Sequence, residues 1–298
     1  ELFGGYNLFQ EAAVRRFWAR SPESRLRPRL FARLYPYLSR DLAQGGGLMA
    51  EFFKAGMTEL DDPLYSHRPR LRTTTRNLRF LAPEVRATSL EVGDPEARLL
   101  ARLPGSFAAM GPLGQAQYLE IATFLTGFLL HSQGDRMLAA HAVEGRFPFL
   151  DVGVAELAAS LPERLRLNGI REKHLLRVAL RGVVPDDINR RPKRPYRAPI
   201  LRAFFGPHAP DYVRELLAPE RVAASGLFNA PAVAKLAAKA TRFVEQGLSE
   251  SDEMGVVGVL STLLLEEQFV RQPRLAPRAT PGRVVVGDRP VADVGLGV

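Results

Sequence analysis

Lys193 is the residue of this sequence best suited to a demanding chemical step. It lies in the run Arg-Arg-Pro-Lys-Arg-Pro-Tyr-Arg at Arg190–Arg197, although the chain uses arginine for nearly all of its 41 basic residues. This choice indicates a need for a compact ammonium rather than for any positive charge. Held in a dry site, a compact ammonium stabilises negative charge that develops on an anionic group, such as a phosphoryl group, in a transition state. The alternative is an exposed basic loop, because charge runs are often solvated.

A second group of polar residues follows the long apolar stretch Gln115–Leu130. The group comprises Ser132, Gln133, Asp135 and Arg136. Polar side chains at the end of a hydrophobic helix suit the wall of a cleft, and we expect Asp135 and Arg136 to contribute to one. Lys173 also stands out as a rare lysine, but a structural role is the stronger alternative there.

The run His-Ala-Val-Glu-Gly-Arg-Phe-Pro-Phe-Leu-Asp at His141–Asp151 combines core and cap residues. We expect its apolar members, Phe147, Phe149 and Leu150, to lie in the core. Glu144 and Arg146 are expected to form a buried pair, because buried charges persist mainly when they are paired. Asp151 is expected to cap a helix that ends near Ser160.

The first residues, Glu-Leu-Phe-Gly-Gly-Tyr at Glu1–Tyr6, offer two adjacent glycines after an apolar pair. Such a pair allows a tight turn or the close approach of a ligand to the backbone. Taken alone, the turn is the better interpretation.

Together these stretches resemble the synthetase domain of glutamine-hydrolysing asparagine synthetases. That family carries a segment Ser-Gly-Glu-Gly-Ala-Asp-Glu-Leu-Phe-Gly-Gly-Tyr, whose last six residues match Glu1–Tyr6. Ser132–Asp151 resembles the family's most diagnostic stretch, and Gly169–Ile200 resembles its lysine-bearing helix, proline turn and Arg-Pro-Lys segment. The resemblance covers roughly Glu1–Val270 and is densest between Gln115 and Ile200.

The resemblance implies asparagine synthesis from aspartate, ATP with Mg²⁺, and ammonia taken from glutamine, through a β-aspartyl-AMP intermediate. It implies that Lys193 faces the ATP phosphates and that Glu1 is the remnant of an acidic pair. Asp135, Arg136 and Lys173 are expected to bind substrate or nucleotide, and no protein-held metal is expected. The implied fold is mostly α-helical, as the carboxyl-terminal portion of an α/β adenine-nucleotide α-hydrolase-like (PP-loop) synthetase domain.

Two parts of such an enzyme are missing from the sequence. There is no cysteine to attack glutamine, and no Ser-Gly-Gly-x-Asp-Ser loop to cradle pyrophosphate; Gln44–Leu48 lacks its serines and aspartate. We therefore expect the isolated chain to be inactive. An interrupted gene, a deliberate truncation and a natural split protein, whose amino-terminal half is a separate partner, all fit. Without the parallel sheet, helix faces should be exposed, so self-association as a homodimer is also expected.

Two alternative functions fit the same residues. One is an ATP-dependent amide ligase that acts on a carboxylate other than aspartate. The other is a non-catalytic binding module, including a nucleic-acid binder, which the formal net charge of +9 favours. Against nucleic acid, the arginines are dispersed among apolar residues, as in Arg25–Arg40, and aromatics are not interleaved with them. We therefore expect no nucleic-acid partner.

The location of the protein is predicted from segments that the sequence lacks. No window reaches the roughly 18 apolar residues of a membrane helix, and the first residues do not read as a signal peptide. A cytoplasmic protein with no membrane partner is expected.

Helical patterns dominate the chain. Residues 1–272 are predicted to form the synthetase-type domain, and residues 273–298, rich in Pro, Gly and Arg, a tail with one short strand at Arg283–Val286. Short helices and loops are expected over Arg70–Leu113. The predicted helices are Phe9–Arg20, Arg27–Ser39, Ala50–Ala55, Gln115–Leu130, Glu172–Arg181, Ala232–Gln246 and Asp252–Val270.

Overall fold

The computed structural model describes residues 1–35, 48–193 and 198–272. Contacts divide the chain into two units, Glu1–Pro199 (unit 1) and Ile200–Val298 (unit 2). Over the described ranges the chain is mostly helical, as predicted, and no strand is found; the β-type pairs there are isolated bridges, Asn168 with Arg171 and Arg181 with Val184. The sheet of a PP-loop domain is therefore not seen in this part of the chain.

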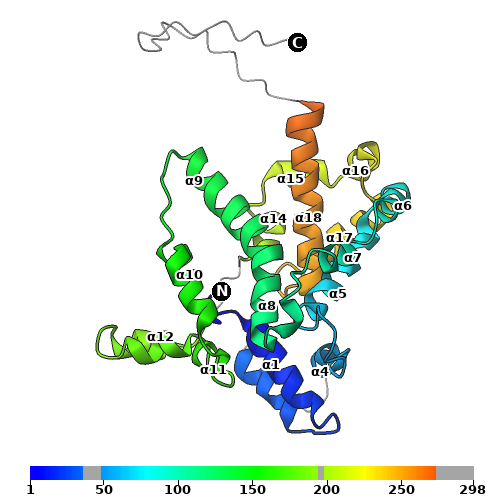
Figure 1. The fold of residues 1–298 in the computed structure, drawn as a ribbon. Helices are drawn as coiled ribbons and strands as arrows, with labels where there is room; N and C mark the ends of the chain where they lie inside the picture. The colour runs from blue at the N-terminus through cyan, green and yellow to red at the C-terminus, as the bar shows by residue number, and fades with distance from the viewer. Residues whose placement is uncertain (36–47, 194–197, 273–298) are drawn as a thin grey trace, which may run out of the picture. The chain divides into compact units, whose positions relative to one another are not determined.

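Unit 1 is built from short helices around one long helical rod (Figure 1). The rod consists of α8, a π-helical stretch η5, and α9. Within η5, the Thr126 hydroxyl donates to the Ile121 carbonyl and the Ser132 hydroxyl to the Gly127 carbonyl, so both side-chain bonds span five residues. The elements are α1 Asn7–Ala19, η1 Arg27–Leu30, α2 Phe31–Leu34, α4 Leu48–Lys54, α5 Arg68–Arg76, η3 Asn77–Phe80, α6 Pro83–Glu91, α7 Pro95–Leu100, η4 Phe107–Ala109, α8 Pro112–Glu120, η5 Ile121–Asp135, α9 Arg136–Ala140, η6 Pro148–Leu150, α10 Val152–Ser160, α11 Glu163–Arg166, α12 His174–Ala179 and α13 Asp186–Arg190.

Unit 2 packs its shorter helices around α18. Its elements are α14 Ile200–Phe205, α15 Asp211–Leu216, α16 Pro219–Ser225, α17 Ala230–Arg242, α18 Glu250–Glu266 and η7 Glu267–Arg271. The predicted apolar stripe of α17 is confirmed, because Val233, Leu236 and Ala240 are buried. They share the core of the unit with Val256, Val259, Leu260 and Leu263 of α18.

Side-chain caps explain where several helices begin. The Asp151 carboxylate accepts hydrogen bonds from the backbone N–H groups of Gly153 and Val154, so the predicted cap of α10 is confirmed. Asn229 caps α17 in the same way through the N–H of Ala232. Such side chains satisfy backbone donors that have no partner inside the helix.

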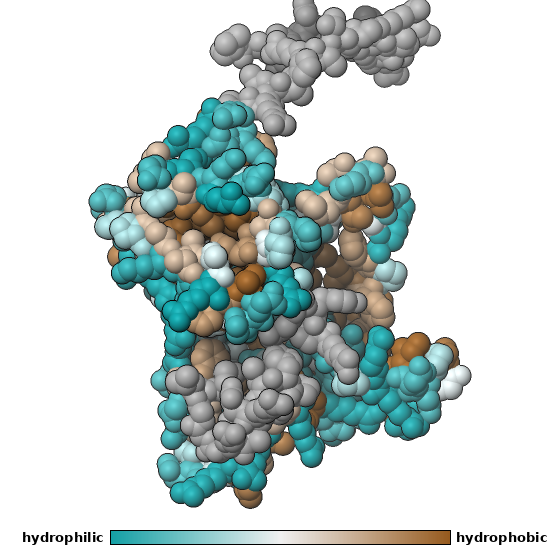
Figure 2. All heavy atoms as spheres, turned by 180° about the vertical axis from the view of Figure 1, so that it is seen from behind, coloured by the Kyte–Doolittle hydropathy of each residue, from teal (hydrophilic) through white to brown (hydrophobic). Residues whose placement is uncertain are grey.

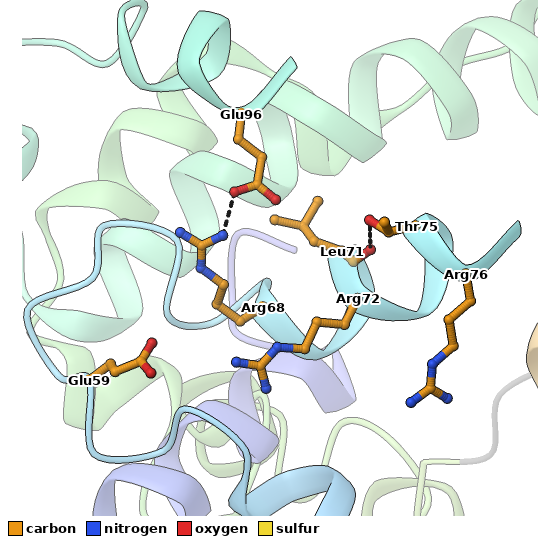
Figure 3. A pocket seen from close by; sticks show the side chains of 7 residues that line it. All are labelled: Glu59, Arg68, Leu71, Arg72, Thr75, Arg76 and Glu96. Carbon is orange, nitrogen blue, oxygen red and sulfur yellow. Dashed lines mark hydrogen bonds and ion pairs between the residues drawn. The ribbon is translucent and has the colours of Figure 1, made fainter. Parts of the chain in front are cut away.

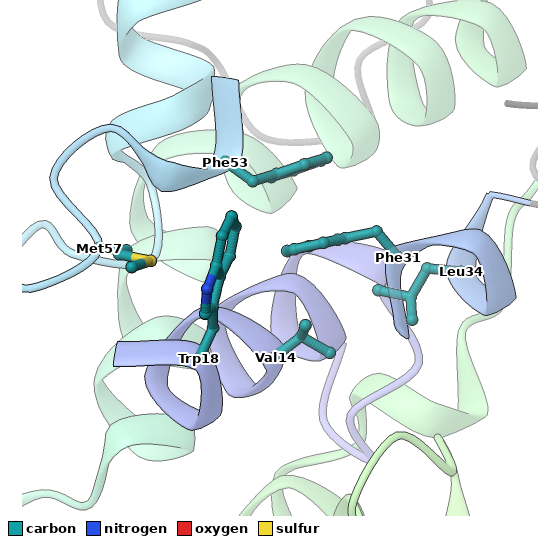
Figure 4. Packing of buried hydrophobic residues seen from close by; sticks show 6 residues of the cluster. All are labelled: Val14, Trp18, Phe31, Leu34, Phe53 and Met57. Carbon is teal, nitrogen blue, oxygen red and sulfur yellow. The ribbon is translucent and has the colours of Figure 1, made fainter. Parts of the chain in front are cut away.

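The main core of unit 1 joins α1, α2 and α4. Phe31 and Phe53 are stacked with ring centroids 3.9 Å apart and planes 6° from parallel, and Trp18 lies beside them (Figure 4). Val14, Leu34 and Met57 complete the buried cluster. Burial of this apolar area fixes α4 against α1 although the two helices are far apart in sequence.

Arg15 is a fully buried cation on α1, and backbone carbonyls hold it. Its guanidinium donates to the carbonyls of Phe53 at 3.0 Å, Tyr65 at 2.8 Å and Ala55 at 3.1 Å. The group also lies over the Tyr65 ring, 4.4 Å from its centroid. Burial lowers the pKa of Arg15 from its usual value. One side chain thus ties α1 to the whole segment from α4 to the start of α5.

A second buried polar cluster joins the start of α5 to α8. Glu120 lies 3.0 Å from Nε2 of His67 and accepts hydrogen bonds from Arg70 at 2.6 and 3.2 Å. Burial alone would raise the pKa of Glu120, but the bonds from His67 and Arg70 lower it below its usual value. Burial lowers the pKa of His67 in spite of the nearby carboxylate. His67 is therefore neutral near pH 7, with Nδ1 2.9 Å from the Ser66 hydroxyl.

Three predictions of burial are wrong. Phe147 and Phe149 are 44% and 59% exposed rather than part of the core. Glu144 and Arg146 do form an ion pair, but both side chains are exposed. Their pairing therefore compensates no desolvation cost and contributes little to stability. Phe149 nonetheless contacts the core at one point, because its ring meets that of buried Phe3 edge-on, with centroids 6.1 Å apart.

The long apolar stretch predicted as a helix over Gln115–Leu130 is only partly buried. Leu119 is fully buried, but past Leu125 the stretch is largely exposed and Phe128 is 44% accessible. Figure 2 shows apolar residues reaching the surface between hydrophilic ones on the face that it presents. Exposed apolar side chains in such number are typical of surfaces that another polypeptide covers.

Several predictions fall outside the described residues. They concern the glycine run Gln44–Leu48 except its last residue, the end of the helix predicted over Arg27–Ser39, and the tail after Gln272 with its strand. The predicted domain boundary after residue 272 stays a prediction. None of the described helices is long and apolar enough to cross a membrane.

Replacing Arg15 by methionine should reduce the free energy of unfolding by about 3 kcal/mol, because three buried carbonyls lose their donor. Urea unfolding followed by the fluorescence of Trp18, the single tryptophan, measures this change in unit 1. Arg20→Met, an exposed change at the end of the same helix, is the control. Equal stability of the two variants would contradict the idea that the hydrogen bonds of Arg15 stabilise unit 1.

The His67 cluster should make stability depend on pH. Because the folded pKa lies below the usual value of 6.5, the unfolded chain binds the proton more readily. Stability is therefore full above that value and is lost as the pH falls below it. We expect His67→Gln to reduce the pH dependence of the free energy of unfolding, measured by urea unfolding between pH 7.5 and 5. Replacing the exposed His208 by glutamine should leave that pH dependence unchanged. The same slope in both variants would exclude His67 as its source.

Candidate functional site

Tight packing of the first residues explains their two glycines. Gly4 has a φ of +68°, which favours glycine, and its N–H donates to the Glu1 carbonyl at 3.2 Å. Gly5 lies against the side chain of Lys173: a Cβ there would stand 2.5 Å from its Cε. Conformation therefore favours glycine at position 4, whereas Gly5 lets the flexible end of the Lys173 side chain pass close to the backbone.

Gln117 of α8 fixes the position of this segment. Its side-chain amide donates to the carbonyls of Glu1 at 2.6 Å and Leu2 at 2.8 Å, and its carbonyl oxygen accepts a bond from Arg166. Gln117 and Arg166 are 5% and 7% exposed, so these bonds form away from water. The backbone N–H of Lys173 adds a bond to the Phe3 carbonyl at 3.2 Å.

The structure brings three of the predicted site residues, Glu1, Lys173 and Lys193, into one neighbourhood. Tyr6 donates its hydroxyl to the Glu1 carboxylate, and the Nζ of Lys193 lies over the Tyr6 ring, 5.8 Å from its centroid. Burial and the bond to Glu1 raise the pKa of Tyr6, so its hydroxyl keeps its proton. The side chains of Lys173 and Lys193 are both exposed, so the dry setting predicted for the Lys193 ammonium is not seen, and their two ammonium groups lie at this corner near one carboxylate, that of Glu1.

The other two predicted residues, Asp135 and Arg136, lie apart from this corner. Asp135 is 18 residues beyond Gln117 (135 − 117) on the same helical rod, which places it on the order of 20 Å farther along the axis. Both side chains are exposed, and no described contact joins them to Glu1, Lys173 or Lys193. The structure thus divides the five predicted residues into a group of three and a pair.

Two residues of the corner are not among those predicted. Gln117 could have been found as a polar residue within an apolar helix, but nothing in the sequence marks Arg166. The Arg166 guanidinium is buried, has no carboxylate within hydrogen-bonding distance among the described residues, and leaves its Nε without a partner. Burial lowers its pKa. A buried cation with such sparse compensation favours a negative charge nearby.

A concave region of unit 1 lies beside α5. Arg68, Arg72 and Arg76 project from successive turns around a cavity of about 550 Å³, with Glu59 and Glu96 on its other sides (Figure 3). Arg68 pairs with Glu96 and with Asp62, and Arg72 donates to the Ala55 carbonyl at 2.7 Å. The carboxylates already balance most of the positive charge. This cavity is therefore a weaker candidate for a polyphosphate than the corner at Glu1.

The residues present fit part of a nucleotide site. The ammonium groups of Lys173 and Lys193 match the charge of a polyphosphate. Over the described ranges no three His, Cys, Asp or Glu side chains gather where they could hold a metal ion. A Mg²⁺ ion that enters with ATP would thus find the Glu1 carboxylate here but no full set of protein ligands.

Comparison with known proteins gives a consistent result. The family model of asparagine synthase matches residues 1–265. Asparagine synthetase [glutamine-hydrolyzing] 1 of Bacillus subtilis is 27% identical over 226 residues, 73% of this chain and 32% of the relative. A putative asparagine synthetase of Mycobacterium bovis is 28% identical over 202 residues, 67% of this chain and 28% of the relative. No solved structure matches the chain significantly.

Some of the relatives are named amidases. Amidase chyE of Penicillium rubens is 30% identical over 173 residues, 54% of this chain and 24% of that protein. The chain thus spans about a third or less of the length of these curated relatives. With a family model that matches most of its length, the chain belongs to the asparagine synthase family.

Proposed function

We propose that this chain supplies the helical, phosphate-facing wall of an ATP-dependent amide ligase. The observation that carries the proposal is the convergence of Lys173, Lys193 and Glu1 at the turn Glu1–Tyr6 in a member of the asparagine synthase family. In the reaction, a carboxylate oxygen attacks the α-phosphorus of ATP, an acyl-AMP forms and pyrophosphate leaves. Ammonia then attacks the acyl carbon, AMP leaves, and the nitrogen gives up a proton. Aspartate is the proposed carboxylate, and glutamine the source of ammonia.

Lys193 has the central role in this proposal. Its ammonium would stabilise the negative charge that develops on the phosphoryl oxygens as the bond to pyrophosphate breaks. The Lys193 ammonium lies over the Tyr6 ring and forms no ion pair with a carboxylate of the described residues, so its charge stays available for the nucleotide. Lys173, whose stem packs on Gly5, would add a second positive charge to the same side.

The remaining parts of the enzyme are proposed to come from residues that the relatives carry outside the matched segment. The apolar surface of unit 1 supports this view, since large side chains along Phe128–Leu157 are exposed. Their exposed fractions range from 44% to 71%: Phe128, Met137, Val143, Phe147, Phe149, Val152 and Leu157. Alone, the chain is proposed to be inactive, and Asp135 and Arg136 would reach substrate from the far end of the rod.

A different carboxylate is the second candidate. The match to a protein named an amidase supports a related ligase whose acceptor is not aspartate. The two candidates share the adenylation step and differ in the acid that starts it. The carboxylic acid that stimulates pyrophosphate release therefore distinguishes the two candidates. Replacement of Lys193 does not, because both candidates use it in the adenylation step.

The first experiment measures pyrophosphate release from Mg-ATP. The chain is assayed alone and together with the amino-terminal segment of the Bacillus subtilis relative, with a panel of carboxylic acids. We expect no release by the chain alone, and release by the pair that depends on aspartate. Release that another acid stimulates more strongly would favour the second candidate. Release by the chain alone would contradict the proposed division of the site.

Lys193→Gln should lower kcat for pyrophosphate release by about 10²- to 10³-fold with a smaller change in KM, because the lost ammonium acts mainly on the transition state. Lys193→Arg should restore part of kcat, since it keeps the charge but not the compact geometry. Lys235→Gln, an exposed lysine on α17, is the matched control. A Lys193→Gln enzyme with unchanged kcat would remove Lys193 from the proposal.

A further inference from the structure

Unit 2 contains an apolar cavity of about 500 Å³ between α14, α15 and α17. Two of its twelve lining residues, Arg214 and Thr241, have polar side chains. The rings of Phe204 and Phe205 line it together with Val213 and Leu217, which are 3% and 9% exposed and so form a fixed floor. A cavity of this size with few polar groups matches the sites at which proteins bind small organic molecules.

The two polar side chains differ in what they can offer a ligand. The Thr241 hydroxyl donates its proton to the Ala237 carbonyl at 3.0 Å, so it has none to spare. Arg214 is exposed and makes no hydrogen bond or ion pair with any residue that the structure describes. Asp211, one turn earlier on α15, does not pair with it. The cavity therefore presents one unneutralised guanidinium beside an apolar interior.

We propose that this cavity binds a monocarboxylic acid with an apolar chain or ring. The apolar body would lie against Phe204, Phe205, Val213 and Leu217, where its removal from water stabilises the complex. The carboxylate would accept paired hydrogen bonds from Arg214, a geometry that a planar guanidinium favours. The charge of Arg214 selects an acid over an uncharged molecule of the same shape.

This inference does not depend on the proposed function. The cavity belongs to unit 2, whereas Glu1, Lys173 and Lys193 belong to unit 1. Failure of one proposal therefore leaves the other intact. A binder of uncharged apolar molecules and a surface for an apolar peptide are the competing possibilities, and the test below distinguishes them.

The probes are octanoate and octan-1-ol, which share an apolar chain and differ in charge. Each is titrated into the full chain by calorimetry, while methyl NMR follows Val213 and Leu217 of the floor. We expect saturable binding of one octanoate per chain, shifts at both residues, and binding of octan-1-ol weaker by about tenfold or more, because it lacks the charge-assisted bonds.

Three variants assign the site. Arg214→Gln should reduce octanoate affinity to that of octan-1-ol, with the floor shifts retained. Thr241→Trp, at an exposed lining position, should fill the mouth and weaken both probes, whereas Lys235→Gln, exposed on the same helix and outside the lining, should change neither. Equal affinity for the two probes, octanoate binding that Thr241→Trp leaves intact, or no saturable binding would each overturn the proposal.

Discussion

The hydrogen bonds of the Gln117 side chain are the constraint on which the candidate site depends. One carboxamide donates to two successive carbonyls, those of Glu1 and Leu2, and accepts from Arg166. Because the Gln117 and Arg166 side chains are shielded from water, each bond that they lose leaves one of their buried polar atoms without a partner. An apolar side chain of the same size could fill the space but could not hold the segment. The location of Glu1, and with it the surroundings of Lys193, depends on this residue together with the bond from the Lys173 N–H to the Phe3 carbonyl.

Buried charge is handled in three different ways within unit 1. Arg15 is surrounded by backbone carbonyls, and Glu120 is shared between His67 and Arg70, so both have nearly complete sets of partners. Arg166 has one amide partner and an unbonded Nε. The first two clusters connect helices, whereas the third lies under the segment that we assign to a ligand. Arg166 thus has the fewest partners of these buried charged groups, as expected where a ligand supplies part of the charge.

Local sequence patterns predicted the helices well and their burial less well. Caps at Asp151 and Asn229 were predictable, because a side chain and the N–H groups that it binds lie within three residues. The exposure of Phe147 and Phe149 was not, since an apolar residue identifies a preference for burial but not the element that covers it. The resemblance pointed to Lys193 and Glu1, and the structure places them near each other. Arg166 depends on contacts 49 residues apart in sequence, which no local pattern reveals.

The central claim is that Lys193 faces the phosphates of a bound nucleotide from the turn Glu1–Tyr6. The most direct measurement is a crystal structure of the chain with its amino-terminal complement, Mg²⁺ and a non-hydrolysable ATP analogue. The account predicts the Nζ of Lys193 at about 3 Å from a phosphate oxygen, with the turn and Gln117 in the positions described above. A nucleotide bound elsewhere, with Lys193 in solvent and more than about 6 Å from any phosphate oxygen, would contradict it.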